Sequence, residues 1–421
     1  MATLIKEVKL IMTEVGTNNN KWWTGQLFDD GKVKATWGRV GYSGDSGEWD
    51  GGQSYLDKKI KEKTKKGYTE LKTVGAVTAS SGSGTTVKDR DLHAIAKTQL
   101  IKSSNPTLER LIKRFVEANV HKITSSTQIT YNSTTGLFAT PLGIVTMDGL
   151  VEARNLLAEL APIVRKGNFG ANADSLLSKY LRLIPQHLGM GRFSAQSVIP
   201  DDNAVQKQND LIDSLESSYQ ATIAAPASPA GTPAKAQEQV FKVDLDVLND
   251  NTERTRLERY FENSKKRMHG YDNVRVKEIF VVNIHEMTNK YENSTAPHKE
   301  VFHGTSQANC LSILKSGLKT APPSTAAIAG KMFGNGVYGA INSTKSLGYS
   351  MGRWGQGGVG DCAWLFICDF AMGKIYETRS SCSPQRGYDS VWAKAGSSLS
   401  NDELIVYRNS QVKIKYLLEC K

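Results

Sequence analysis

Two low-complexity stretches constrain the fold most strongly, because they divide the 421-residue chain into three blocks. They read GAVTASSGSGTT, at residues 75–86, and AAPASPAGTPAKAQ, at residues 224–237. Segments so rich in Gly, Ser, Ala and Pro bury no core and are typical of flexible tethers. We therefore expect linkers at 76–97 and 224–238, which separate domains at 1–75, 98–223 and 239–421.

The first block combines strand-like runs with a basic helix. KWWTGQLFD and KVKATWGRVGYSG are separated by the turn residues DDG, and YLDKKIKEKTKKGYTEL follows them. Six lysines and one acid lie between Lys58 and Lys66, in a chain of net charge +11. A lysine run can simply be a solvated helix face, and Trp22 and Trp23 could pack in a small core. Aromatics beside cations also suit nucleic acid ends, where a ring stacks on an exposed base or sugar.

The triplet Trp37-Gly38-Arg39, followed by VG and later by KKGYTEL, resembles the WGR domain. This resemblance implies a small sheet with one helix that binds DNA, often at breaks. By similarity, Trp37 would lie against the terminal sugar-phosphate, and Arg39 would bridge to the adjacent helical domain. The DNA-binding residues that we expect are Trp37, Arg39, Lys58, Lys59, Lys61, Lys63, Lys65 and Lys66.

The second block has helical periodicity. Leu108, Leu111, Ile112, Phe115 and Val116 follow the spacing of one helix face, and similar patterns recur to Tyr219. The phrases TPLGIVTMDGLVEARNLLAEL and YLRLIPQHLGM resemble the regulatory helical domain that precedes the catalytic domain of DNA-dependent poly(ADP-ribose) polymerases. We expect an all-α bundle there, without catalytic residues.

The third block mixes strand-like runs, such as VKEIFVVNI and CAWLFICDFAMGKIY, with short helical segments. Because strands outnumber convincing helices, we expect an antiparallel-rich α+β domain. The fold class predicted for the whole chain is therefore multidomain α+β, in which a small sheet-plus-helix domain and a helical bundle precede this domain.

The residue types of the third block suit cleavage of the nicotinamide bond of NAD+. Such a site must hold a planar carboxamide, flank the ring with aromatics and stabilise the cation that develops on the ribose. Glycoside chemistry meets a similar oxocarbenium-like state with a carboxylate. A glycine lets the amide approach the backbone closely, and a hydroxyl supplies one more hydrogen bond.

These residue types occur in the order FHGT, GKMFGNGVY, KSLGY and DELIVY, and the block resembles the catalytic domain of poly(ADP-ribose) polymerases, the H-Y-E class of ADP-ribosyltransferases. By similarity, His303, Tyr338 and Glu403 are catalytic, and Lys345 holds the acceptor chain. Glu403 would bond the nicotinamide-ribose 2′-OH and polarise the acceptor hydroxyl, while Ser346 would donate to the amide oxygen. The residues implied to bind NAD+ are His303, Gly304, Thr305, Asn309, Lys319, Tyr338, Ser346 and Tyr349.

Each of these residues has a structural alternative when it is taken alone: His303 as a strand histidine, Tyr338 as a core aromatic, Ser346 as a helix cap and Glu403 as a turn acid. Their common order and spacing favour the functional interpretation. The sequence also departs from the family. Gly339 follows Tyr338 where an aromatic is common, and Lys319 replaces a frequent Arg, which exchanges a bidentate fork for a point charge.

The resemblance implies a DNA-break-activated enzyme that polymerises ADP-ribose on proteins, including itself, and consumes NAD+ as a substrate without a bound cofactor. The alternatives are a DNA-end-binding scaffold with weak activity and a mono-ADP-ribosyltransferase. Five cysteines without a C-x-x-C pair predict no metal site. The start lacks a signal-peptide pattern, so we expect a soluble monomer with no membrane contact. It would be nuclear in a eukaryote and otherwise cytoplasmic and DNA-associated.

Overall fold

The computed structural model divides into two compact units, Met1–Val87 with Lys122–Tyr219 and Lys88–His121 with Gln220–Lys421. Residues 76–91 of the first predicted linker, and all of the second, lie outside the described residues. Among the described residues, no helix has the length and apolar composition needed to cross a bilayer. The described ranges are 2–70, 92–101, 105–126, 130–132, 137–140, 143–144, 146–223, 239, 241–320, 332–351, 362–396 and 399–421.

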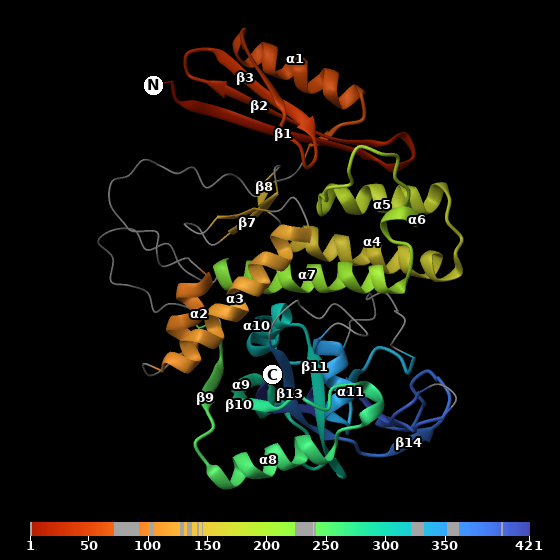
Figure 1. Cartoon of the computed structure of the whole chain (residues 1–421). Helices are drawn as coiled ribbons and strands as arrows, with labels where there is room; N and C mark the ends of the chain where they lie inside the picture. Colours follow the sequence, from red (N-terminus) through yellow and green to blue (C-terminus); the bar gives the residue numbers. More distant parts are fainter. Residues whose placement is uncertain are drawn as a thin grey trace. The chain divides into compact units, whose positions relative to one another are not determined.

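The first unit begins with an antiparallel five-stranded sheet in the order β4-β3-β2-β1-β5. Along β3, Val33 and Ala35 are buried whereas Lys34 is exposed, which is the alternation of a sheet covered on one face. Helix α1 covers that face and buries Leu56 (Figure 1). The bounds are β1 Leu4–Glu14, β2 Asn19–Phe28, β3 Lys32–Arg39, β4 Asp45–Asp50, α1 Gly52–Lys65 and β5 Thr69–Glu70.

Four helices follow in the first unit. Thr146 caps the start of α4 by accepting a hydrogen bond from the Gly149 N–H, and Gly167 ends it with a left-handed φ of 67°. Helix α5 packs against β1 and against the 3₁₀ turn η1, Val15–Thr17, where the Ser178 hydroxyl accepts from the Val15 N–H at 2.9 Å. The bounds are α4 Met147–Lys166, α5 Ala171–Leu183, α6 Ala195–Val198 and α7 Asp202–Ile223.

The all-α bundle predicted for residues 98–223 is not confirmed. Three short strands, β6 Thr130–Asn132, β7 Leu137–Thr140 and β8 Gly143–Ile144, form a small antiparallel sheet inside that range. The sequence here is rich in Thr and lacks the helical period, so it favours extended backbone. Two boundaries between the units also fall within this range, one inside helix α3, Pro106–Ser126, and one inside α7.

The second unit contains two sheets. One has the order β11-β13-β17-β10-β9 with antiparallel neighbours, and the other has the order β12-β16-β15-β14, in which only the β14–β15 pair is parallel. The predicted antiparallel-rich α+β architecture is therefore confirmed. The strands are β9 Val243–Val247, β10 Val276–Ile284, β11 His298–Thr305, β12 Val337–Gly339, β13 Ala363–Ala371, β14 Ile375–Thr378, β15 Ser390–Ala393, β16 Glu403–Val406 and β17 Val412–Cys420.

Short helices pack around these sheets. Helix α2, Leu92–Leu100, begins inside the range predicted as the first linker, and its Ala96 and Leu100 are buried, so this part of the range belongs to a folded element. The remaining helices of the second unit, apart from α3, are α8 Asn251–Asn263, α9 His285–Lys290, α10 Gln307–Ser316 and α11 Ser343–Ser350, with the 3₁₀ turns η3 Arg267–His269 and η4 Asn409–Gln411.

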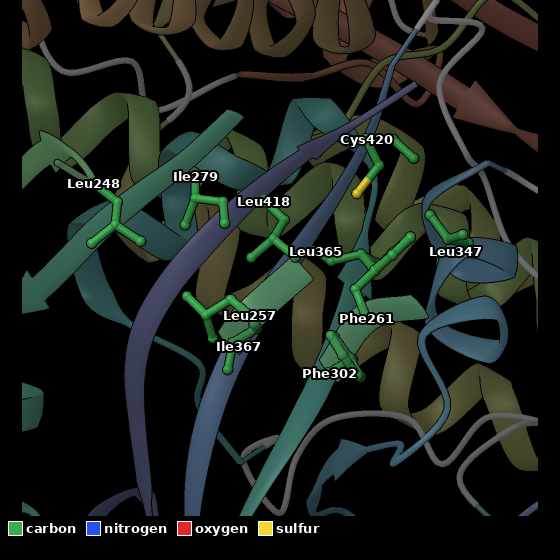
Figure 2. Close-up of a cluster of buried hydrophobic side chains, with 11 residues drawn as sticks. Leu248, Leu257, Phe261, Ile279, Phe302, Leu347, Leu365, Ile367, Leu418 and Cys420 are labelled. Carbon is green, nitrogen blue, oxygen red and sulfur yellow. The ribbon is translucent and has the colours of Figure 1, made fainter. Parts of the chain in front are cut away.

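The core of the second unit lies between the first sheet and the helices α8 and α11. Phe302 belongs to this core and is fully buried, and its ring stacks on Tyr260 with centroids 4.5 Å apart. Figure 2 shows the cluster, which draws on β10, β11, β13 and β17. Because Phe302 directly precedes His303, this cluster fixes the strand that carries the first candidate site residue.

We expect Phe302→Ala to lower the free energy of unfolding by about 3–5 kcal/mol, because it removes a buried ring and leaves a cavity. Urea unfolding of the full chain would measure the change. Phe302→Leu is the comparison, and it should cost less because it keeps most of the apolar volume. Equal losses in the two variants would show that cavity formation is not the cause.

Candidate active site

Residues distant in the sequence meet where β11, β12, β16 and α11 come together. Strand β12 pairs with β16, so that Tyr338 lies opposite Ile405, and Phe302 forms a bridge with Ala340. Helix α11 packs directly on β11. These pairings gather the predicted residues His303, Gly304, Tyr338, Lys345, Ser346, Tyr349 and Glu403 on adjoining elements.

His303 on β11 is held in one tautomer. Its Nδ1 lies 2.9 Å from the Tyr338 carbonyl oxygen, which can only accept, so Nδ1 carries the proton. Desolvation lowers the pKa of His303, and this effect outweighs the opposing hydrogen bond to Tyr338. The imidazole is therefore neutral near pH 7, and its Nε2 can accept a hydrogen bond from a hydroxyl group.

Gly304 permits the close approach of α11 to β11. A Cβ atom at Gly304 would lie 1.8 Å from the Ser346 carbonyl oxygen, so any side chain would force the two elements apart. The buried Ser346 hydroxyl donates to the Phe302 carbonyl at 3.1 Å. In this state Ser346 Oγ can only accept from a ligand, and donation to an amide oxygen, the role implied by resemblance, requires the hydroxyl to turn away from Phe302.

Glu403 is the first residue of β16 and forms a buried ion pair. Its Oε1 lies 2.9 Å from Lys345 Nζ and 3.4 Å from the Tyr349 hydroxyl, and both Glu403 and Lys345 are 5% exposed. Desolvation lowers the pKa of Lys345, and the Glu403 carboxylate opposes this by favouring the charged ammonium. Both contacts fall on Oε1, so Oε2 can accept from a ligand hydroxyl.

A second layer of polar residues, which the sequence analysis did not identify, supports this ion pair. Lys345 Nζ also donates to the Asn401 carbonyl at 3.0 Å, and the Asn401 side-chain amide lies 2.9 Å from His269 Nε2. His269 Nδ1 in turn lies 2.8 Å from the Thr344 hydroxyl. Asn401, His269 and Thr344 are buried and scattered along the sequence, so no local pattern could have indicated them.

The two predicted ring-flanking tyrosines differ in how they are fixed. The Tyr338 hydroxyl donates to the Gly334 carbonyl at 2.8 Å and accepts from the Phe333 N–H at 3.0 Å. Tyr349 is 36% exposed and donates to Glu403. Burial raises the pKa of both hydroxyls, so both remain protonated donors.

The residues expected on the adenosine side are less closely grouped. Asn309 Nδ2 lies 3.4 Å from the Thr305 hydroxyl, so these two residues are neighbours at the junction of β11 and α10. Lys319 lies beyond the end of α10 and is exposed. The structure therefore brings Thr305 and Asn309 together, whereas Lys319 is exposed among the described residues.

Gly339 leaves no gap in the site wall. A Cβ atom at this position would lie 2.5 Å from Val301 Cγ2 and 3.0 Å from the Phe370 ring. These two side chains occupy the space that a larger residue would need. The missing aromatic is thus compensated by packing from β11 and β13.

In the described part of the chain, no group of three or more His, Cys, Asp or Glu side chains is arranged to hold a metal ion. Cys310, Cys368 and Cys420 are buried, and desolvation raises the pKa of each thiol. They are therefore protonated at neutral pH, when a thiolate would be the reactive form.

The residues predicted to bind DNA lie in different surroundings within the first unit. Arg39 faces the helices: its Nε donates to the Gly189 carbonyl at 2.8 Å, and its other nitrogens bond Asn18. Trp37 instead lies beside Trp49, with ring centroids 6.0 Å apart. The exposed lysines of this set are Lys58, Lys61, Lys65 and Lys66, whereas Lys59 and Lys63 are partly buried.

Two family models match parts of this chain. Residues 251–398 match the poly(ADP-ribose) polymerase catalytic domain, and residues 7–74 match the WGR domain. The catalytic match includes His303, Tyr338 and Ser346 but ends before Glu403. The position of Glu403 in the site is therefore an observation of the structure alone.

Similar proteins include poly [ADP-ribose] polymerase 2 from Arabidopsis thaliana, 24% identical over 87% of this chain and 60% of that protein. Poly [ADP-ribose] polymerase 2 from Zea mays is 25% identical over 89% of this chain and 58% of that protein. Protein mono-ADP-ribosyltransferase PARP3 from Homo sapiens is 22% identical over 97% of this chain and 86% of that protein. The chain thus spans about 60% of the length of the two plant relatives.

The role in NAD+ binding that the resemblance implies for His303, together with the lowered pKa of this residue, gives a prediction of pH dependence. As the pH falls, the KM for NAD+ should rise only below the ordinary histidine pKa of 6.5, because protonation removes the Nε2 acceptor. Steady-state kinetics between pH 5 and 8 would test this. His303→Gln is the control: it should have a raised KM without an inflection. An inflection above pH 6.5, or one retained in the Gln variant, would contradict the assignment.

Proposed function

Because the chain contains a poly(ADP-ribose) polymerase catalytic domain and a WGR domain, we propose that it is a DNA-break-activated NAD+ ADP-ribosyltransferase that builds ADP-ribose polymers. The acceptors would be proteins, including the enzyme itself, and the setting would be the DNA damage response. The observation that carries this proposal is the buried Lys345–Glu403 ion pair, which holds one carboxylate rigidly beside His303, Tyr338 and Ser346 on adjoining elements.

The contacts around β11 support NAD+ as the substrate. His303 Nε2 would accept from a hydroxyl of the adenosine ribose. The Gly304 backbone and Ser346 would hold the nicotinamide carboxamide together, because the missing side chain at Gly304 lets α11 bring Ser346 directly against β11. Tyr338 and Tyr349 would flank the ring. NAD+ is consumed in this proposal and is not a resident cofactor.

In the reaction, the bond between the nicotinamide nitrogen and the ribose anomeric carbon breaks, and neutral nicotinamide leaves with the bonding electron pair. The acceptor oxygen attacks the same carbon from the opposite face and forms the new C–O bond. Its proton passes toward Glu403 and then to solvent. The Glu403 carboxylate would accept from the nicotinamide-ribose 2′-OH and stabilise the positive charge that develops on the ribose.

Lys345 would have two effects on this step. Its ammonium fixes Glu403 Oε1, so the carboxylate does not lose orientation when the substrate enters. Its Nζ also donates to the Asn401 carbonyl, so the chain that leads into β16 is held at a second point. The predicted acceptor-binding role of Lys345 thus combines with a positioning role.

Contacts between α3 and α10 within the second unit support regulation of the candidate active site by α3. The Arg114 carbonyl on α3 accepts from Gln307 at 3.3 Å, and Asn119 donates to the Ala308 carbonyl at 3.2 Å. Both partners lie at the start of α10, which directly follows the strand that bears His303. DNA could activate the enzyme through α3 on the condition that it binds the loosened state more tightly than the closed one.

Two alternatives are distinguishable. A DNA-end-binding scaffold with weak activity would incorporate no label from NAD+, with or without broken DNA. A mono-ADP-ribosyltransferase would label protein without forming polymer. The second alternative is favoured by the similarity to a relative named as a mono-ADP-ribosyltransferase, which this chain covers over 86% of its length. Against it stands the presence of Glu403 in the site.

Glu403→Gln should abolish chain elongation while DNA binding and folding persist, because a neutral amide cannot polarise the acceptor hydroxyl. The measurement is gel analysis of labelled polymer formed by the full chain on broken DNA. Glu377→Gln is a matched control because Glu377 lies on β14 of the same sheet, away from the gathered residues, and it should leave polymer length unchanged. Long polymer from Glu403→Gln would refute the assignment.

Reversing the charge of the exposed lysines Lys58, Lys61 and Lys65 to Glu should weaken DNA binding and flatten its salt dependence. Each lost phosphate contact should reduce the slope of log K against log salt by about 0.9. Fluorescence anisotropy over a salt series measures this slope. Lys179→Glu, at an exposed position on α5, is the control. An unchanged slope in the triple variant would show that α1 does not contact phosphate.

A further inference from the structure

A cavity of about 220 Å³ lies between α1 and the sheet of the first unit. Trp23, Trp37 and Trp49 line it from three strands, and Tyr55, Lys59 and Lys63 line it from α1. The three helix residues are spaced four apart, so they form one edge of the helix. The cavity is smaller than the roughly 300–1,000 Å³ typical of sites for drug-sized ligands, so a dinucleotide such as NAD+ would not fit.

The register of the sheet explains why a hollow exists here. Ala35 pairs with Gly25 on one side and with Gly47 on the other, so a row of small residues crosses three strands. Large aromatic residues flank this row, because Trp23 pairs with Trp37 and Trp49 pairs with Val33. The small residues therefore leave room beneath the helix for the indole rings that line the cavity.

The indole rings are held in place by the same small residues. A Cβ atom at Gly25 would lie 2.3 Å from the Trp23 ring, and one at Gly47 would lie 2.4 Å from the Trp49 ring. Each ring thus fills the space beside its own strand's glycine. The Trp49 ring also stacks on Tyr55, with centroids 5.7 Å apart and planes 29° from parallel. The aromatic walls are consequently formed before any ligand arrives.

The charged side chains that line this cavity indicate which kind of ligand it can bind. Aromatic cages commonly bind quaternary ammonium groups, but here two ammonium groups would repel such a ligand. Lys59 pairs with Glu62 at 3.1 Å, whereas Lys63 forms no ion pair with another described residue. Desolvation, followed by repulsion from Lys66 and Lys59, lowers the pKa of Lys63, so a neighbouring anion would stabilise its charge.

We propose that this cavity binds one unpaired nucleobase at a DNA end, with the adjoining phosphate held by Lys63. A nucleobase is planar, and any of the four bases can stack on aromatic rings. The phosphate of the same nucleotide would place a negative charge next to the Lys63 ammonium. The inference rests on the proposed DNA-binding function of this unit and deepens it: DNA ends with an unpaired nucleotide become the preferred ligand.

The test compares two hairpin duplexes that carry a single unpaired nucleotide, either thymidine or an abasic residue. At one fixed salt concentration, fluorescence anisotropy of the 421-residue chain should show about tenfold tighter binding of the thymidine hairpin, the gain expected from stacking one base. Trp49→Leu should remove this preference and leave affinity for the abasic hairpin unchanged. Trp49→Phe retains a ring and should retain most of the preference.

Trp22→Leu is the matched control, because Trp22 lies on β2 beside Trp23 but points to the opposite face of the sheet. It should retain the preference. Equal binding of both hairpins by the unaltered protein would overturn the proposal that the cavity binds a nucleobase, while leaving DNA binding intact. A preference for the thymidine hairpin that survives Trp49→Leu would overturn it as well. Failure to bind either hairpin would overturn the DNA-binding function as well. Binding of a trimethyl-lysine peptide that Trp49→Leu abolishes would show a cation cage instead.

Discussion

The buried ion pair between Lys345 and Glu403 is the interaction on which the candidate active site of the second unit depends. Two charges removed from water are costly, and each is tolerated because the other lies 2.9 Å away. The pair ties helix α11 to strand β16, while Gly304 lets the same helix sit directly on β11. The spacing of three elements is thereby fixed around one carboxylate, which is the geometry that a developing ribose cation requires.

Close packing around this ion pair also fixes the positions of the candidate site residues. Phe302 anchors the strand before His303, and Val301 with Phe370 fills the space beside Gly339, so the wall of the site is rigid despite an uncommon glycine. The hydrogen bonds from Asn401 through His269 to Thr344 extend the support beneath Lys345. Preorganisation of this kind limits the motion of the reacting groups when substrate binds.

The first unit uses small residues for a different purpose. In the second unit, a glycine allows two elements to touch, whereas Gly25 and Gly47 leave room for the Trp23 and Trp49 rings that line the cavity under α1. Trp37 and Lys63, which appear in the sequence as a motif residue and as one member of a lysine run, become two sides of one cavity. Arg39, two residues from Trp37, instead bonds Gly189 and secures the sheet to the helices.

The sequence by itself determined the strand and helix character of the terminal blocks and indicated the residues that the structure gathers at the candidate active site. Alternation and motif order are local properties, so they can be recognised without coordinates. Only the tertiary structure decided that Asn401 and His269 support Lys345, that residues 130–144 include strands, and that a cavity lies under α1. Those features depend on strand register and on contacts between residues more than a hundred positions apart, such as the 132 that separate His269 from Asn401. No local pattern encodes such contacts, because each is set by the packing of the whole unit.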